Sequence, residues 1–395
     1  MPNNQKPRPQ NRQKPVQNRP KGPAPARVAA LEALMDVQIA DAYAGLALTR
    51  RIAAARLTAL DRRLMTELFY GVLRSLLRDR GRIVWPEEPV ERLSVEHSFP
   101  KWLAQKLVDD FGLEFATALM SYRDKQHSVT VRPNLTRISC AEFEQYMTEQ
   151  GFDWEKGAFP GAYRVRGGFV SQHPGFRGGL YSIMGEASML AAQAVGAKPG
   201  QQVLDCCAAP GGKACYLAEL MQGSGRVYAW DLHEHRVQLI SGAAKRLGLD
   251  NVRTRVQDAR ELVDSQVERM DCVLVDAPCS GLGDYLSKPD IKYNITPEGI
   301  AALHETQTAI LDAACRYVKP GGTLVYSTCT LFKEENEQTV VAFLKAHPEF
   351  SLNGLERMLP EEFAKQTVDG MLTLYPHVSG TDGFFIARMT RSKRS

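Results

Sequence analysis

Residues 203–213 read Val-Leu-Asp-Cys-Cys-Ala-Ala-Pro-Gly-Gly-Lys, a short apolar run followed by a turn of small residues. Pro210, Gly211 and Gly212 predict a tight turn without bulky side chains, so a ligand can approach the backbone closely. In open α/β sheets, ligands bind at the carboxyl ends of the strands. The segment therefore predicts the first strand, turn and helix of such a sheet, together with one wall of a binding site.

The same alternation of short apolar runs and helical patterns continues along the chain. The other predicted strands cover residues 227–231, 252–256, 272–276, 323–327 and 384–389. Strands separated by helices are typical of a parallel sheet with helices on both faces. We therefore predict an α/β fold with a doubly wound, Rossmann-like domain over residues 172–395.

Acidic residues at two of these strand ends indicate the kind of ligand. Asp231 ends the strand after the turn, where a carboxylate suits the two hydroxyls of a ribose, and Asp258 ends the third strand, where it can reach an adenine amino group. A nicotinamide dinucleotide site normally has G-x-G-x-x-G, and the three spaced glycines are absent here. The sequence therefore favours a nucleoside cofactor without a pyrophosphate, S-adenosylmethionine, over a dehydrogenase cofactor.

Two later strands are each followed by a cysteine: Cys279 in Asp276-Ala-Pro-Cys-Ser-Gly, and Cys329 in a Tyr-Ser-Thr-Cys-Thr run. C5 of a pyrimidine is a poor nucleophile, but a thiolate that adds to C6 makes C5 an enamine carbon able to attack a methyl sulfonium. A carboxyl group near N3, here Asp276, stabilises that intermediate. Asp-Ala-Pro-Cys also differs from the Asn/Asp-Pro-Pro-aromatic run of adenine amino-methyltransferases, so we predict methylation of carbon.

These motifs, together with Thr-Asp-Gly-Phe-Phe at 381–385, resemble the RNA 5-methylcytosine methyltransferases of the Nol1/Nop2/Sun family over about residues 172–390. The resemblance implies an enzyme that uses S-adenosylmethionine to methylate C5 of a cytosine in RNA. It implies that Cys329 is the nucleophile and Cys279 the releasing residue. It also implies cofactor contacts from Cys207, Ala208, Ala209, Pro210, Gly211, Gly212, Lys213, Asp231, Asp258 and Asp276.

A small α+β RNA-binding lobe is expected within residues 99–171, after linker helices. Residues 128–136 have strand character, and Pro133 predicts an edge strand or a loop end. Arg132-Pro-Asn134 resembles the Arg-x-Asn element of this lobe, and Pro-Asp-Ile-Lys-Tyr at 289–293 also fits the family. RNA contacts are therefore expected from Arg132, Asn134 and Lys292. Lys292 could instead contact the catalytic loop, and a solvated surface position is an equal alternative.

Residues 27–98 are expected to be all helical. A helix from about Thr58 to Arg78 carries an apolar residue every fourth position, namely Leu60, Leu64, Leu68, Val72 and Leu76. The segment from Arg27 resembles the start of a NusB-like helical domain, shortened because few residues remain before the next family motif at Phe99. This partial NusB-like segment favours small-subunit (16S) ribosomal RNA as the substrate, with transfer RNA as the alternative.

The charge of the chain is concentrated at its ends. The overall net charge is +4, but residues 1–26 hold six basic residues, no acidic residue and seven of the 22 prolines. With a further +3 at the C-terminal end, the residues between are net negative. We expect the Pro-rich tail to be disordered and either to help hold RNA or to act as a solubilising segment.

Several classes of protein are disfavoured by composition. The sequence shows neither an apolar run of about 18 residues nor a secretory leader, so we expect a cytoplasmic protein with no membrane partner. The eight cysteines lack CxxC or Cys/His metal spacing, so reduced thiols and no metal are expected. Nothing demands an oligomer, so a monomer is expected. A non-enzymatic RNA-binding or assembly protein remains the alternative, because Gly185-Glu186 replace the family's Gln-Asp.

Overall fold

The chain forms two compact units, residues 1–84 and 85–395, in the computed structural model. The structure describes residues 25–39, 48, 51–52, 57–78, 85–123, 128–166 and 170–393. Almost all of the predicted basic tail lies outside the described residues. The boundary predicted after residue 98 differs from the observed one, because helix α4 (Pro89–His97) buries Val90 and Leu93 against the second unit.

The first unit is built around helices α1 (Pro25–Ile39) and α3 (Ala59–Arg78). The predicted start of α3 is confirmed, since the Asp61 amide donates a hydrogen bond to Thr58 Oγ1 at 3.2 Å. The predicted apolar row does not form the core: Leu64, Leu68 and Val72 are exposed. The row one residue later, with Met65 and Phe69, packs instead against the small alanines of α1. The NusB-like resemblance stays a prediction.

The second unit begins with helix α4, which is followed by helices α5 (Lys101–Phe111) and α6 (Leu113–Ser121) and then by a small lobe. Its antiparallel sheet has the order β2-β3-β1-β4, and helices α7 and α8 accompany it. The bounds are β1 (Ser128–Pro133), α7 (Cys140–Glu149), β2 (Asp153–Lys156), β3 (Tyr163–Arg166), η2 (Val170–Gln172), α8 (Pro174–Arg177) and β4 (Tyr181–Ile183). Strand β1 is an inner strand and Pro133 is its last residue, so the edge-strand alternative was wrong. Strand β4 also belongs to this lobe, although the predicted domain boundary assigned it to the catalytic domain.

A nine-stranded sheet forms the rest of the unit, with the order β11-β12-β13-β9-β8-β5-β6-β7 and β10 paired to β13. Strands β9, β8, β5, β6 and β7 are parallel, whereas β13 runs antiparallel to β9. The bounds are β5 (Gln202–Asp205), β6 (Arg226–Asp231), β7 (Val252–Val256), β8 (Met270–Asp276), β9 (Val318–Thr328), β10 (Phe350–Leu352), β11 (Thr367–Val368), β12 (Met371–Leu374) and β13 (Phe384–Arg391). All six predicted strands and the doubly wound α/β class are confirmed.

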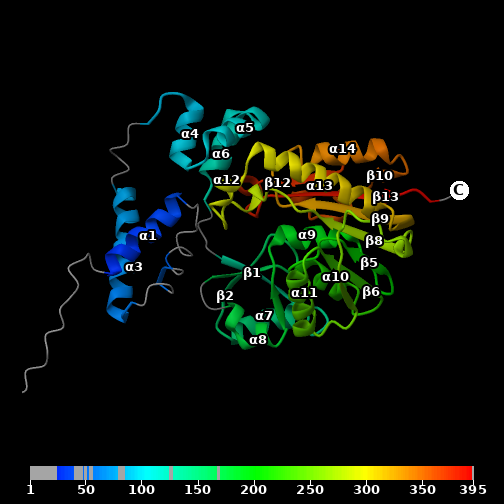
Figure 1. Cartoon of the computed structure of the whole chain (residues 1–395). Coiled ribbons are helices and arrows are strands. Elements are labelled where there is room, and N and C mark those ends of the chain that lie inside the picture. Colours follow the sequence, from blue (N-terminus) through cyan, green and yellow to red (C-terminus); the bar gives the residue numbers. More distant parts are fainter. Residues whose placement is uncertain are drawn as a thin grey trace, which may run out of the picture. The chain divides into compact units, whose positions relative to one another are not determined.

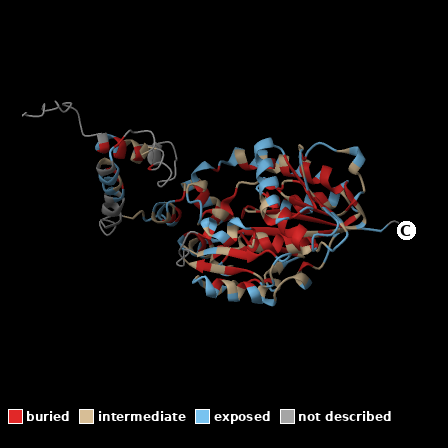
Figure 2. Cartoon of the chain, turned by 90° about the horizontal axis from the view of Figure 1, so that it is seen from below, coloured by how far each residue is buried: buried red, intermediate tan, exposed pale blue. Residues whose placement is uncertain are grey.

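Helices cover both faces of this sheet (Figure 1). On one face lie α9 (Glu186–Val195), α10 (Gly212–Leu220) and α11 (Glu234–Leu247), and on the other α13 (Pro297–Cys315) and α14 (Glu337–Ala346). Each face has its own apolar cluster, and Figure 2 shows the buried residues gathered on the sheet and on the inner sides of these helices. Burial on both faces explains why the central strands are continuous apolar runs. The shorter elements are η3 (Asp264–Gln266), η4 (Leu282–Asp284), α12 (Ile291–Asn294), η5 (Leu355–Met358), α15 (Glu361–Ala364) and α16 (Pro376–Ser379).

Three features of the structure bear on the class of protein: the state of the cysteines, the grouping of possible metal ligands and the apolarity of the helices. All eight cysteines are free thiols. In the described ranges, no three His, Cys, Asp or Glu side chains are grouped so as to hold a metal ion. None of the helices that the structure describes is long and apolar enough to cross a bilayer.

Candidate active site

The two predicted reactive cysteines meet at the carboxyl end of the parallel sheet. Strands β8 and β9 are neighbours, with Asp276 opposite Ser327 in their register. The loops that follow these strands place Cys279 Sγ 3.3 Å from Cys329 Sγ, and the Cys329 amide donates to Cys279 Sγ at 3.3 Å. The sheet register thus brings together two thiols that are 50 residues apart in sequence.

A glycine permits the close approach of the loops around the thiols. The Gly283 amide donates to the Cys329 carbonyl at 2.9 Å, and the Gly383 amide donates to the Gly283 carbonyl at 3.0 Å. A side chain at Gly283 would collide with the backbone carbonyl of Gly383. The Thr-Asp-Gly-Phe-Phe segment at 381–385 therefore packs against the two cysteine loops through backbone contacts.

Charged groups lie beside one of the thiols. Lys213 Nζ contacts Asp276 Oδ2 at 2.7 Å, and Ser327 Oγ donates to Asp276 Oδ1 at 2.8 Å. Burial favours the neutral form of Lys213, but the charge of Asp276 and its hydrogen bond outweigh this, so the pKa of Lys213 is raised. A cavity of about 160 Å³ is lined by Lys213, Asp276 and Cys329, together with Ala187, Ser188, Ala277, Asp284, Asp382 and Phe384. Lys213, predicted as a cofactor contact, therefore reaches the reacting end of the site.

The predicted cofactor loop joins β5 to α10. It contains a cis Ala209–Pro210 peptide, and Gly211 has φ +107°, in the region that favours glycine. Open space surrounds the position that a side chain at Gly212 would take. The loop is joined to the next strand, because the Ala209 amide donates to Asp231 Oδ2 at 3.2 Å. Such a cradle fits a cofactor that approaches the backbone.

The two predicted ribose- and adenine-binding acids are both held in place by arginines. Asp231 is the last residue of β6, as predicted, and its carboxylate lies 3.4 Å from Arg236. Asp258 follows β7 by two residues, and Arg260 binds its carboxylate at 2.6 Å. The hydrogen bond from Arg260 lowers the pKa of Asp258. Asp258 is therefore held as a carboxylate, and both acids lie at the sheet edge that the cofactor loop borders.

Asp205, at the end of β5, is an acid that the sequence analysis did not single out. It is fully buried, and no side chain that the structure describes donates a hydrogen bond to its carboxylate. Burial, and then the charge of Asp276, raises the pKa of Asp205 to about 8. An orphaned acid directly before the glycine turn fits a site for a cationic group of a cofactor. Its place as the last residue of the first strand was the signal that could have identified it.

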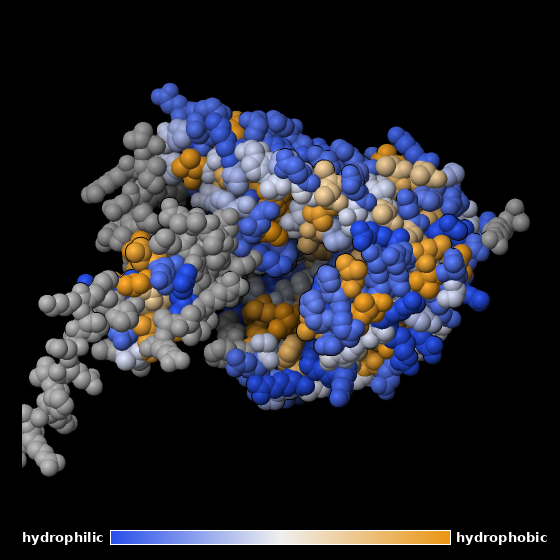
Figure 3. Space-filling model, viewed as in Figure 1, coloured by the Kyte–Doolittle hydropathy of each residue, from blue (hydrophilic) through white to orange (hydrophobic). Residues whose placement is uncertain are grey.

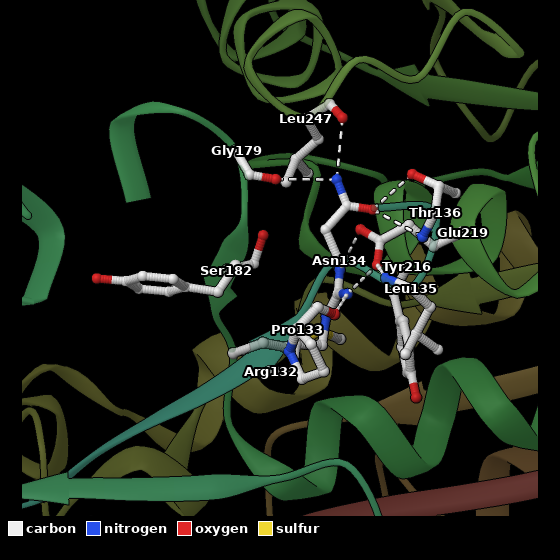
Figure 4. Close-up of polar contacts among 12 residues, drawn as sticks. Arg132, Pro133, Asn134, Leu135, Thr136, Gly179, Ser182, Tyr216, Glu219 and Leu247 are labelled. Atoms are coloured by element: carbon white, nitrogen blue, oxygen red, sulfur yellow. Dashed lines mark hydrogen bonds and ion pairs between the residues drawn. The ribbon is translucent and has the colours of Figure 1, made fainter. Parts of the chain in front are cut away.

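Arg132 and Asn134 do not lie on an RNA-binding surface, which corrects their predicted role. Arg132 is 1% exposed, contacts Glu219 at 2.5 and 3.1 Å, and lies over the Tyr216 ring at 4.1 Å. Asn134 is fully buried and donates to the carbonyls of Gly179 and Leu247, each at 2.9 Å (Figure 4). These contacts join the small lobe to α10 and α11, so the Arg-x-Asn element is a structural joint.

Lys292 is also buried rather than exposed to RNA or solvent. Its Nζ donates to the His97 carbonyl at 3.2 Å and lies 4.3 Å from the centre of the Phe99 ring. Burial, with a smaller effect from Arg123, lowers the pKa of Lys292 to about 8. Both interpretations of this residue, as an RNA contact and as a solvated lysine, were therefore wrong: it joins α12 to the segment between α4 and α5.

A larger cavity of about 670 Å³ adjoins the small one, because Asp382 lines both. It lies between the small lobe and the loops at the sheet edge, and Figure 3 shows the surface hollowed there. Arg123 is an exposed residue of its lining. Arg164, also in the lining, pairs with Glu186 at 2.7 Å, and Glu186 further accepts from the Phe159 amide at 3.0 Å. The Glu186 that departs from the family pattern thus holds the lobe against α9.

Comparisons with known proteins find relatives among RNA methyltransferases. A family model described as 16S rRNA methyltransferase RsmB/F matches residues 192–390. The probable ribosomal RNA small subunit methyltransferase B of Bacillus subtilis is 42% identical over 325 residues, covering 81% of this chain and 73% of that protein. The 25S rRNA (cytosine-C(5))-methyltransferase nop2 of Schizosaccharomyces pombe is 27% identical over 79% of this chain and 54% of its own length. A solved methyltransferase homologue from Pyrococcus horikoshii superposes with a TM-score of 0.66 at 30% identity, covering 78% of this chain and 99% of that one.

Proposed function

The chain belongs to the 16S rRNA methyltransferase RsmB/F family, and from this premise we propose that it methylates a cytosine of small-subunit ribosomal RNA through a covalent bond between Cys329 and C6. Its activity is S-adenosylmethionine-dependent methylation of cytosine C5 in RNA, and RNA is its partner. The roles of individual residues and the identity of the RNA are the parts that we propose.

One observation supports Cys329 as the nucleophile. Of the two thiols, Cys329 lines the small cavity with Lys213 and Asp276, whereas Cys279 is not part of the lining. A cytosine in this cavity would present C6 to the Cys329 sulfur. Addition of the thiolate to C6 makes C5 nucleophilic, and S-adenosylmethionine supplies the methyl group that C5 takes.

Asp276 and Lys213 are placed to protonate N3 of the base and to hold the protonated N3. In this proposal the Asp276 carboxylate, held by Ser327 and Lys213, faces N3 of the base and accepts a hydrogen bond from N3 once N3 is protonated. Lys213 keeps its proton in the resting site and is the donor that neutralises N3 as the thiolate adds. We assign the cofactor to Cys207, Ala208, Ala209, Pro210, Gly211, Gly212, Asp231 and Asp258, with Asp205 for its ammonium group.

Cys279 completes the reaction. After methylation, a base must remove the C5 proton so that the Cys329–C6 bond breaks and the thiolate is regenerated. The Cys279 sulfur lies 3.3 Å from the Cys329 sulfur, and C5 is the neighbour of the C6 atom to which Cys329 would be bonded. Cys279 is therefore close to the proton that must be removed. The larger cavity is wide enough to admit an unstacked nucleotide, so we propose a single-stranded or loop target whose cytosine is flipped out.

The test is methylation of RNA by variant proteins. We expect Cys329→Ala to abolish 5-methylcytosine formation, and Cys279→Ala to accumulate a covalent protein–RNA adduct. Cys140→Ala, which alters a half-buried thiol of the small lobe, is the matched control. Full activity of Cys329→Ala would overturn the assignment of the nucleophile.

The substrate class and setting need a separate measurement. Bisulfite sequencing of ribosomal and transfer RNA, with and without the gene, distinguishes the proposed substrate from its alternative. Titration calorimetry with S-adenosylmethionine tests the non-enzymatic alternative, which predicts no binding at millimolar cofactor. We also propose a monomer located in the cytoplasm, which light scattering and cell fractionation can check.

A further inference from the structure

Glu335 is a buried carboxylate whose hydrogen-bond donors are all neutral. The residue is fully buried in the turn before α14. Oε1 accepts from Ser280 Oγ at 2.5 Å, while Oε2 accepts from the Ser280 amide at 2.9 Å and from Gln307 Nε2 at 2.8 Å. The Ser280 amide and the Gln307 side-chain amide can only donate, so Oε2 is an acceptor with two donors, while Oε1 accepts from the Ser280 hydroxyl.

The same turn holds both cysteine loops. Glu335 holds Ser280, the residue after Cys279, and its partner Gln307 also donates to the Pro278 carbonyl at 2.9 Å. Asn336, next in sequence, accepts from Thr328 Oγ1 at 2.5 Å and donates to the Thr330 carbonyl at 3.0 Å. These two neighbouring residues therefore clamp the segments on either side of Cys279 and of Cys329.

We propose that Glu335 is a positioning residue that makes Cys329, rather than Cys279, the thiolate that attacks the RNA; this rests on the proposed function. Two sulfurs 3.3 Å apart do not both ionise, so at most one of the two is a thiolate at a time. The charge of Glu335, fixed one residue from Cys279, disfavours a thiolate there. Lys213, in the cavity with Cys329, favours the thiolate on that side.

The order of the two steps follows from the same charges. Once the Cys329 sulfur is bonded to C6 it is a neutral thioether, so it no longer opposes a charge on Cys279. Cys279 can then lose its proton to solvent and accept the C5 proton, after which the Cys329–C6 bond breaks. Glu335 thereby keeps Cys279 protonated until the attack has occurred and leaves it available for release.

The groups that face Cys279 in the described part of the chain are Cys329, Glu335 and Tyr326. The pKa of Cys279 is raised by the hydrogen bond with Cys329, by burial, and by the charges of Cys329 and Glu335. Tyr326 is a neutral phenol that donates to the Glu335 carbonyl at 2.7 Å. In a Cys329→Ala protein, burial and Glu335 still raise the pKa of Cys279, while the hydrogen bond from the backbone amide of residue 329 still lowers it.

The experiment measures alkylation of Cys279 by iodoacetamide against pH in the full-length Cys329→Ala protein, followed by mass spectrometry of the Cys279 peptide. We expect Glu335→Gln in this background to move the midpoint down by about one pH unit, so that alkylation below the midpoint is about tenfold faster. Glu335→Asp keeps the charge and should keep the midpoint. Glu334→Gln is the matched control, because Glu334 is partly exposed and pairs with Lys106 at 2.5 Å.

An unchanged midpoint in folded Glu335→Gln would overturn the proposal, as would an equal shift in Glu334→Gln. Should Glu335→Gln not fold, Ser280→Ala in the wild-type background tests the clamp: we expect the protein–RNA adduct to persist several-fold longer, and unchanged release would contradict it. The alkylation assay uses neither RNA nor cofactor. It therefore reports on Glu335 even if methylation by Cys329→Ala shows that the proposed function is wrong.

Discussion

Arg132 and Glu219 form a bidentate ion pair in which both side chains are buried, with N–O distances of 2.5 and 3.1 Å. Arg132 comes from β1 of the small lobe and Glu219 from α10, the helix that begins at the cofactor loop. The pair therefore fixes the lobe relative to the cofactor site.

We predict that Arg132→Met destabilises the protein by about 3–5 kcal/mol, because it leaves the Glu219 carboxylate buried without its partner. Urea unfolding followed by circular dichroism measures this loss. The double variant Arg132→Met/Glu219→Leu should recover most of it, since no charge is then buried. In the temperature range where the single variant stays folded, the salt dependence of RNA binding should match wild type; a flatter dependence would restore Arg132 as an RNA contact.

Asp205→Asn should raise the melting temperature and weaken cofactor binding. The pKa of Asp205 is about 8 in the folded protein and near 3.8 when unfolded, so the folded state binds the extra proton. The stabilisation from this bound proton is complete below the pKa of Asp205 in the unfolded chain, near 3.8. It is lost as the pH rises through the pKa in the folded protein, about 8. The gain in stability from Asp205→Asn should therefore grow between about pH 4 and pH 8 and level off above it.

Melting curves at several pH values, with titration calorimetry of S-adenosylmethionine, test both parts of the Asp205 prediction. Asp271→Asn is a matched control, because Asp271 is partly exposed and pairs with Lys319 at 2.7 Å. A gain in melting temperature that does not change with pH would show that ionisation of Asp205 is not its source. Undiminished cofactor affinity would remove Asp205 from the cofactor site.

The catalytic sheet could be predicted from sequence because its strands are short, apolar and ended by chemically distinctive residues. The pairing of Cys279 with Cys329 followed from the rule that parallel strands share one carboxyl edge. Strands β10, β11 and β12 were missed, because runs of two to four residues carry too little periodicity.

Roles that depend on burial could not be predicted from sequence. Arg132, Asn134 and Lys292 are polar residues in RNA-methyltransferase motifs, and polarity alone suggested an exposed RNA-binding surface. The structure instead gives them buried partners in distant segments, and no local pattern encodes a partner more than 40 residues away. Glu335 was overlooked for the same reason, since its value lies in its contacts with Ser280 and Gln307.

Arg123→Gln should weaken RNA binding without changing cofactor binding. Its exposed guanidinium lines the larger cavity and donates to the carbonyls of Met120 and Tyr122, which leave its charge available for a phosphate. Removing one phosphate-binding cation should reduce the slope of log Kobs against log salt by about 0.7–0.9. Fluorescence anisotropy with a labelled RNA at several salt concentrations measures the slope. Arg177→Gln, on α8, is the control because it removes the same charge at another place. An equal reduction of the slope in that variant would show that Arg123 contributes only through the net charge of the protein.

Deletion of residues 1–24 should also flatten the salt dependence of RNA binding, and by more than Arg123→Gln does. The deleted segment contains all six basic residues of the tail and no acidic residue, while helix α1 begins at Pro25 and is left intact. The residues between the two ends of the chain are net negative, whereas the tail is a segment with six positive charges and no negative one. Each phosphate that the protein neutralises adds about 0.7–0.9 to the steepness of the slope, so removing a tail that binds along the RNA should reduce it by several such steps.

A variant in which the six basic residues become glutamine keeps the length and separates charge from chain volume. Wild-type slopes in both proteins would show that the tail takes no part in binding and only contributes to solubility.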